Sequence, residues 1–107
     1  MFGEINDLKK FLRMLDKKDI YFSPHFYDKS EVDRIYLTEE LIQDRLKDTK
    51  NVVGFQKQKI NEEERYRIGI ELSNKYNLVI ICKLSRKGLY IITAWKSNRK
   101  WEKSIQK

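Results

Sequence analysis

Hydrophobic side chains in the second half of this 107-residue chain recur with the two-residue period of a β-strand. Apolar and polar positions alternate from Arg65 to Leu72, which is typical of a strand with one buried face. Gly88, at the end of a short polar segment, is suited to the positive φ of a hairpin turn. Four consecutive strands with short connections predict an antiparallel meander over residues 50–96, with a polar loop at 60–64. The predicted strands are 52–55, 65–72, 78–84 and 89–95.

The first half of the chain has a helical period instead. Apolar residues from Ile5 to Leu15 recur at three- and four-residue steps, which predicts an amphipathic helix over residues 4–18. Thr38 followed by two glutamates predicts the start of a second helix. A threonine side chain can cap the first helical turn, and the helix dipole stabilises acidic side chains in that turn. We expect that helix to end near Asp48, a shorter helix at 28–36, and an extended segment at 20–22.

These elements predict one α+β domain over residues 1–107, in which N-terminal helices pack on a four-stranded antiparallel β-sheet. The predicted parts are an N-terminal helix (4–18), an extended segment with two short helices (20–48), the meander (50–96) and a basic tail (97–107).

Composition argues against several classes of protein. The single cysteine, Cys82, cannot form an internal disulfide, and its apolar neighbours predict a buried, reduced thiol. Together with the single histidine, His25, it supplies too few ligands for a zinc site. We find no phosphate-binding glycine loop or dinucleotide fingerprint and expect no cofactor. No apolar run approaches the ~18 residues needed to cross a bilayer, and the N-terminus has no signal-peptide pattern. We therefore expect a cytoplasmic protein without membrane contact.

Positive charge is concentrated at the C-terminal end of the chain. Residues 83–107 carry eight basic side chains and one acid, Glu102, which equals the net charge of +7 for the whole protein. Residues 1–82 carry fifteen basic and fifteen acidic side chains. A local surplus of this kind attracts polyanionic partners.

Aromatic residues are interleaved with this basic cluster, and the combination is typical of surfaces that bind single-stranded nucleic acid. The alternative is a solvated surface on which Trp95 and Trp101 close the edge of the core. Arg65 and Arg67 lie on one face of their predicted strand and either extend the basic surface or pair with nearby glutamates. The candidate residues of the cluster are Lys83, Arg86, Lys87, Tyr90, Trp95, Lys96, Arg99, Lys100 and Trp101.

His25 is a candidate for proton transfer, because histidine exchanges a proton near neutral pH without special tuning. It follows Pro24 and lies among aromatic residues. A lone histidine is more often structural than catalytic, and the sequence leaves both interpretations open.

Three stretches resemble segments of a known family. They are the apolar strand Asn77–Cys82, the strand Leu89–Lys96 and the basic segment Asn98–Lys103. With His25 and the Leu37–Glu40 helix start, they resemble the small ribonuclease toxins of the RelE/ParE superfamily, above all its BrnT-like branch. The likeness covers roughly residues 20–105, and Trp95 stands where the family strand carries arginine.

The resemblance implies metal-independent cleavage of RNA by a toxin whose active face is covered by a neighbouring antitoxin. Such cleavage needs a base for the ribose 2′-hydroxyl, cations for the phosphorane charge and an acid for the leaving oxygen. By resemblance, His25 is the base or acid, Arg67, Lys83 and Lys96 stabilise charge, and Tyr90 positions the substrate or donates a proton. Two alternatives fit the same residues: a non-catalytic nucleic-acid-binding module, and a protein-interaction domain with an acidic partner.

Overall fold

The computed structural model describes residues 3–24, 26 and 38–98. The predicted helix at 28–36, the tail beyond Asn98 and the candidate residues His25, Arg99, Lys100 and Trp101 lie outside the described residues.

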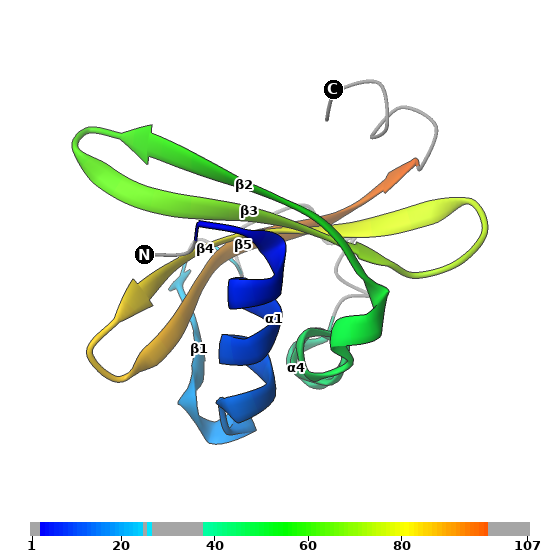
Figure 1. Cartoon of the computed structure of the whole chain (residues 1–107), viewed down its shortest axis with the longest axis horizontal. Helices are drawn as coiled ribbons and strands as arrows, with labels where there is room; N and C mark the ends of the chain where they lie inside the picture. Colours follow the sequence, from blue (N-terminus) through cyan, green and yellow to red (C-terminus); the bar gives the residue numbers. More distant parts are fainter. Residues whose placement is uncertain (1–2, 25, 27–37, 99–107) are drawn as a thin grey trace.

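A five-stranded mixed sheet forms the centre of the molecule (Figure 1). The predicted meander is confirmed, because β2 to β5 pair in sequence order and antiparallel. The expected four-stranded antiparallel sheet is corrected by a fifth strand, β1, which pairs parallel to β5 at the edge. The short segment 20–22 carries no local signal for a partner almost seventy residues away. The strands are β1 (Ile20–Phe22), β2 (Val52–Ile60), β3 (Glu63–Glu71), β4 (Tyr76–Ser85) and β5 (Gly88–Asn98).

The first hairpin of the meander is longer than the sequence predicts. A two-residue turn, Asn61–Glu62, joins β2 to β3 in place of the expected loop at 60–64. Both residues have positive φ, 53° and 67°, as a tight hairpin turn requires. The sequence did not predict this part of β2, because its side chains at 56–59 are polar and lack the pattern of a half-buried strand. An edge strand can expose such side chains to solvent.

Two helices cover one face of the sheet (Figure 1). Helix α1 (Ile5–Met14) ends four residues before the predicted bound, and a 3-10 turn, η1 (Lys17–Asp19), follows it. Helix α4 (Glu39–Lys47) begins at the predicted cap, since the Thr38 hydroxyl accepts a hydrogen bond from the Leu41 amide at 3.1 Å. A second 3-10 turn, η2 (Thr49–Asn51), leads into β2. None of the helices in the described ranges is long and apolar enough to span a membrane.

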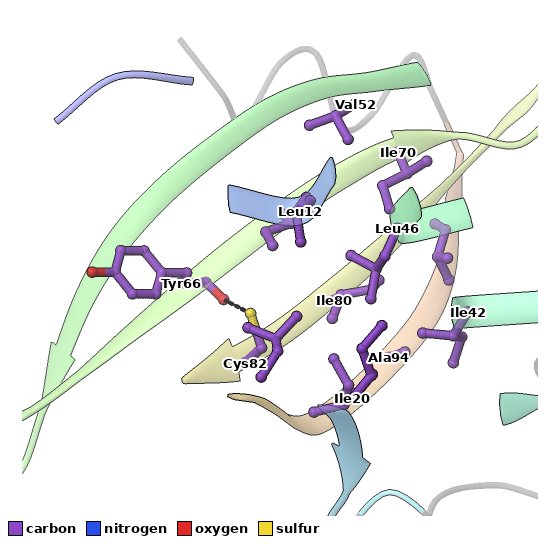
Figure 2. Packing of buried hydrophobic residues seen from close by; sticks show 14 of the residues in the cluster. Leu12, Ile20, Ile42, Leu46, Val52, Tyr66, Ile70, Ile80, Cys82 and Ala94 are labelled. Carbon is purple, nitrogen blue, oxygen red and sulfur yellow. Dashed lines mark hydrogen bonds between the residues drawn. The ribbon is translucent and has the colours of Figure 1, made fainter. Parts of the chain in front are cut away.

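The core lies between these helices and the sheet (Figure 2). Leu12 of α1 and Leu46 of α4 are fully buried against Ile80 of the central strand and its neighbours. Cys82 lies in the same core, and its thiol donates a hydrogen bond to the Tyr66 carbonyl at 3.7 Å. Burial raises the pKa of the Cys82 thiol to about 12. The predicted burial of the thiol is therefore confirmed.

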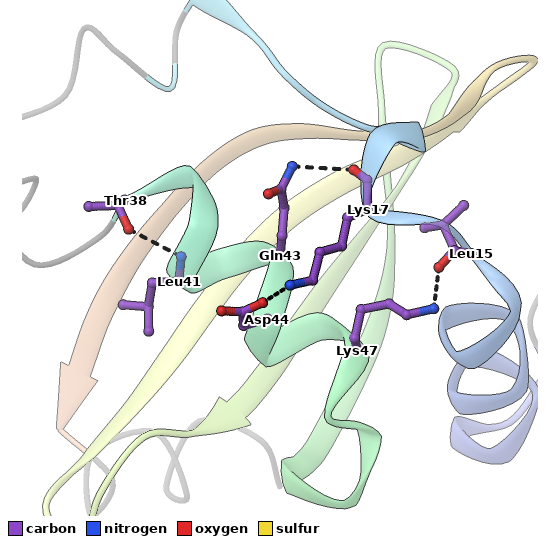
Figure 3. Close-up of polar contacts among 7 residues, drawn as sticks. All are labelled: Leu15, Lys17, Thr38, Leu41, Gln43, Asp44 and Lys47. Carbon is purple, nitrogen blue, oxygen red and sulfur yellow. Dashed lines mark hydrogen bonds and ion pairs between the residues drawn. The ribbon is translucent and has the colours of Figure 1, made fainter.

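Polar contacts from α4 fix the C-terminal end of α1 and the turn behind it (Figure 3). The Lys47 ammonium donates to the carbonyl oxygens of Leu12 at 3.0 Å and Arg13 at 2.8 Å, and also to that of Leu15. A cation at this position satisfies the carbonyls of the last helical turn. Lys17 of η1 pairs with Asp44 of α4, which holds η1 beside that helix.

A β-bulge in β5 decides which side chains of this strand face the helices. Cys82 pairs with Ile91, whereas Ile81 pairs with Thr93, so Ile92 is an extra residue. The alternation therefore shifts by one, and Ala94 enters the core in place of Thr93. The Ser23 hydroxyl, just after β1, donates a hydrogen bond to the Ile92 carbonyl at 2.8 Å. The carbonyl of the bulged residue therefore has a hydrogen-bond partner.

Candidate nucleic-acid interface

A row of aromatic and basic side chains crosses the face of the sheet that points away from α1 and α4, here called the outer face. Tyr21 of β1 is in register with Tyr90 of β5, which is in register with Lys83 of β4. Directly paired residues place their side chains on the same face, so the three lie side by side. The Lys83 ammonium stands 5.4 Å from the centre of the Tyr90 ring. We call Tyr21, Tyr90 and Lys83 the outer row.

The β4–β5 hairpin tip adds two exposed cations beside this row, further along the same two strands. Arg86 and Lys87 occupy the turn, where the Ser85 hydroxyl accepts from the Lys87 amide at 3.3 Å. They share a shallow depression of about 530 Å³ with the two tyrosines of the outer row. The depression is lined by Tyr21, Phe22, Ser85, Arg86, Lys87 and Tyr90.

A carboxylate meets the outer row at its Lys83 end. Lys83 donates to Glu63 at 2.6 Å, and the Arg65 guanidinium donates to the same carboxylate at 2.8 Å. The hydrogen bond from Lys83, and then that from Arg65, keep the pKa of the Glu63 carboxyl below its ordinary value. Glu63 is therefore ionised at neutral pH and balances part of the charge of its two partners.

This pairing occurs where the sheet divides. Pairing between β3 and β4 ends at Tyr66 and Cys82, although β3 begins at Glu63 and β4 continues to Ser85. The β2–β3 and β4–β5 hairpins therefore diverge at this end of the sheet (Figure 1). A depression of about 540 Å³ lies between their ends, and Glu63, Lys83 and Ser85 are among its lining residues.

Two candidates on the outer face lie away from this row. Arg67 is only 9% exposed and lines a separate depression of about 300 Å³ with Gly54 and Gln56. Trp95 pairs with Val79, which is fully buried, toward the opposite end of β5. Both residues therefore lie on the outer face, and the outer row does not include them.

Lys96 lies on the other face of the sheet. It is in register with Leu78, a core residue, and its ammonium stands 4.4 Å from the centre of the Tyr76 ring. The bulge at Ile92 separates the side chain of Lys96 from those of Lys83 and Tyr90. The structure therefore does not bring it to the charge-stabilising residues with which the resemblance grouped it.

Two residues of the site were not singled out from the sequence. Tyr21 reaches the outer row only through the long-range pairing of β1 with β5. Glu63 belongs to an acidic run, 62–64, that is typical of a solvated loop. Its pairing with Arg65 agrees with the alternative that this arginine answers nearby glutamates. The two-residue spacing of Glu63 and Arg65 could have predicted that they pair, because residues two apart on a strand lie on the same face.

The described residues contain no group of three or more histidine, cysteine, aspartate or glutamate side chains able to hold a metal ion. The described part of the interface presents tyrosine rings, ammonium and guanidinium groups and the Glu63 carboxylate. Comparison of the chain with family models, with curated proteins and with solved structures gave no match in any of the three.

Proposed function

We propose that this domain binds single-stranded RNA across the outer row and the β4–β5 hairpin tip. One observation carries the proposal: Tyr21 and Tyr90 line the same depression as Arg86 and Lys87. Tyrosine faces stack on unpaired bases of any sequence, and the two cations lie within reach of the adjoining phosphates. The charge surplus of residues 83–107 supports the same partner.

A single strand suits this surface better than a duplex. Bases in a helix are stacked on each other, so an aromatic face can reach them only where they are splayed apart. The choice of RNA over DNA rests on the resemblance to ribonuclease toxins, and parallel titrations with both oligonucleotides test it.

Loss of either tyrosine ring is expected to weaken RNA binding strongly. Each stacked base contributes ~1–3 kcal/mol, so Tyr21→Ala and Tyr90→Ala should each raise the Kd by about 5- to 150-fold. The measurement is fluorescence anisotropy of a labelled 12-nucleotide single-stranded RNA at fixed salt. A duplex of the same sequence should bind less tightly to the unmodified protein.

The two turn cations have a matched control elsewhere on the sheet. The pair Arg86→Gln/Lys87→Gln should lower the salt dependence of binding, by about 0.7 in log K against log salt for each lost phosphate contact. The pair Lys57→Gln/Lys59→Gln removes the same charge from the exposed part of edge strand β2. An equal decrease of the salt dependence in the two double variants would mean that the protein binds RNA only through its overall charge.

Metal-independent cleavage of RNA is a second candidate function. It is favoured by one cluster, in which the Tyr90 ring, the Lys83 ammonium and the Glu63 carboxylate lie together beside the proposed RNA path. Lys83 would stabilise the phosphorane charge, and the Tyr90 hydroxyl would donate a proton to the leaving oxygen. His25, the base or acid that the resemblance implies, would accept the proton of the attacking 2′-hydroxyl. This is also the activity that the toxin resemblance implies.

Tyr90→Phe separates cleavage from binding. Phenylalanine keeps the ring that stacks and removes the hydroxyl, so RNA affinity should stay within about twofold while cleavage falls by about 100-fold or more. Gel analysis of end-labelled RNA in EDTA measures the cleavage, with His25→Ala and Lys83→Ala tested in parallel. Cleavage that survives in Tyr90→Phe would remove the proposed role of its hydroxyl. RNA that binds but stays intact with the unmodified protein would leave binding as the function.

A further inference from the structure

The chain places a carboxylate of its own between Lys83 of the outer row and Arg65 of β3. Glu63 accepts from Lys83 at 2.6 Å and from Arg65 at 2.8 Å, and these donors belong to the neighbouring strands β4 and β3. The three side chains are each about one-third exposed, at 35%, 34% and 28%. The cluster is therefore open to solvent and to a ligand.

A carboxylate and a phosphodiester can bind to such a pair of cations in a similar way. Each is a monoanion that presents two oxygens to hydrogen-bond donors, and a guanidinium and an ammonium bind either of them. Ion pairs that are this exposed contribute little to stability, so exchange of one anion for the other costs the fold little.

The position of the cluster suits a nucleic-acid chain. The Lys83 ammonium lies over the Tyr90 ring, 5.4 Å from its centre, so a phosphate bound to Lys83 lies close to a base that packs on that ring. The depression between the diverging hairpins adjoins Lys83 and Glu63, and it shares Ser85 with the tyrosine-lined depression. A strand that continues from the tyrosine-lined depression therefore meets Lys83 together with the carboxylates of Glu63 and Glu64.

We propose that Lys83 and Arg65 form a phosphate subsite, which Glu63 occupies in the free protein and which an RNA phosphate takes over on binding. This inference rests on the proposed RNA-binding function and adds to it a site and a competing group. Glu63 acts as an internal competitor that lowers the affinity for RNA and restricts tight binding to ligands able to displace it.

Glu63→Gln tests the subsite, with Glu62→Gln as its matched control. Both substitutions remove one negative charge, at adjacent positions, with little change of shape. Only Glu63 is paired with Lys83 and Arg65, so Glu63→Gln should lower the RNA Kd by about 3- to 10-fold more than Glu62→Gln does. It should also steepen the salt dependence by about 0.7 for each cation released to a phosphate. In the triple variant Glu63→Gln/Arg65→Gln/Lys83→Gln this gain should disappear.

Inorganic pyrophosphate provides a readout that does not depend on RNA. In ¹⁵N-edited NMR spectra, the Arg65 Nε–H resonance should shift on addition of pyrophosphate, at lower concentration in Glu63→Gln than in Glu62→Gln. If the protein binds no RNA but this shift occurs, the RNA-binding function fails and the anion subsite stands. If RNA binds while both glutamine variants behave alike and the resonance does not move, the subsite is overturned and the RNA-binding function stands.

Discussion

Gly88→Ala is expected to destabilise the protein by about 3–5 kcal/mol, because both the backbone and the space at this position exclude a side chain. Gly88 has φ +145°, a conformation that residues with a side chain rarely adopt. A Cβ atom there would lie 2.1 Å from the carbonyl oxygen of Asp19 and 2.9 Å from its Cβ. Relief of this clash requires the β4–β5 hairpin to move away from η1, and with it the turn that carries Arg86 and Lys87.

Gly3→Ala is the control for that substitution. A Cβ atom on Gly3 would meet only the Asp7 carboxylate, at the ordinary contact distance of 3.8 Å, and the residue is exposed. Urea denaturation followed by circular dichroism should give an unchanged midpoint for Gly3→Ala, within about 0.5 kcal/mol. A Gly88→Ala protein as stable as the unmodified one would contradict the close approach of Gly88 to Asp19.

Ile80→Ala is expected to have the second largest effect, a loss of about 2–5 kcal/mol in the free energy of unfolding. Ile80 is fully buried at the middle of β4, in the core beneath Leu46 of α4 (Figure 2). Truncation removes apolar contacts and leaves a cavity that two strands and two helices cannot close without moving apart. Because domains of this size are stable by only about 5–15 kcal/mol, the variant should unfold at much lower urea.

Val53→Ala, on edge strand β2, is the comparison for this loss. Val53 is 45% exposed, so its truncation should change stability by no more than about 0.5 kcal/mol. The urea midpoints of Ile80→Ala and Val53→Ala, measured in the same series, compare truncation at a buried and at an exposed position. Equal effects at the two positions would contradict the packing of β4 against the helices.

The Ile80 prediction and the outer-row predictions concern opposite faces of the sheet, which makes their effects on stability and on RNA binding separable. Ile80 faces the helices, whereas Tyr90 and Lys83 face outward from the neighbouring part of the same hairpin. An outer-row variant that unfolds like the unmodified protein but loses RNA affinity would therefore report on the interface itself. Circular dichroism of each variant used in the RNA titrations supplies this check.

Local patterns predicted most of the elements of this fold. The two-residue period over 65–72 and the apolar run that follows determined an antiparallel meander, because each strand pairs with the next across a short turn. The Thr38 cap and the burial of Cys82 were likewise local consequences of residue type. The positive φ of Gly88 was also predicted from a local signal and is confirmed.

The candidate interface depended on contacts that no local pattern contains. Sequence patterns predicted a basic, aromatic hairpin near the C-terminal end of an α+β domain. Only the tertiary structure placed Tyr21 beside Tyr90, turned Lys96 to the other face through the bulge at Ile92, and set Glu63 between Lys83 and Arg65. The physical reason is that side-chain direction along a strand follows from its register with its neighbours, and a single bulge reverses it. That register is fixed by packing of the whole sheet against α1 and α4, to which residues far apart in the chain contribute together.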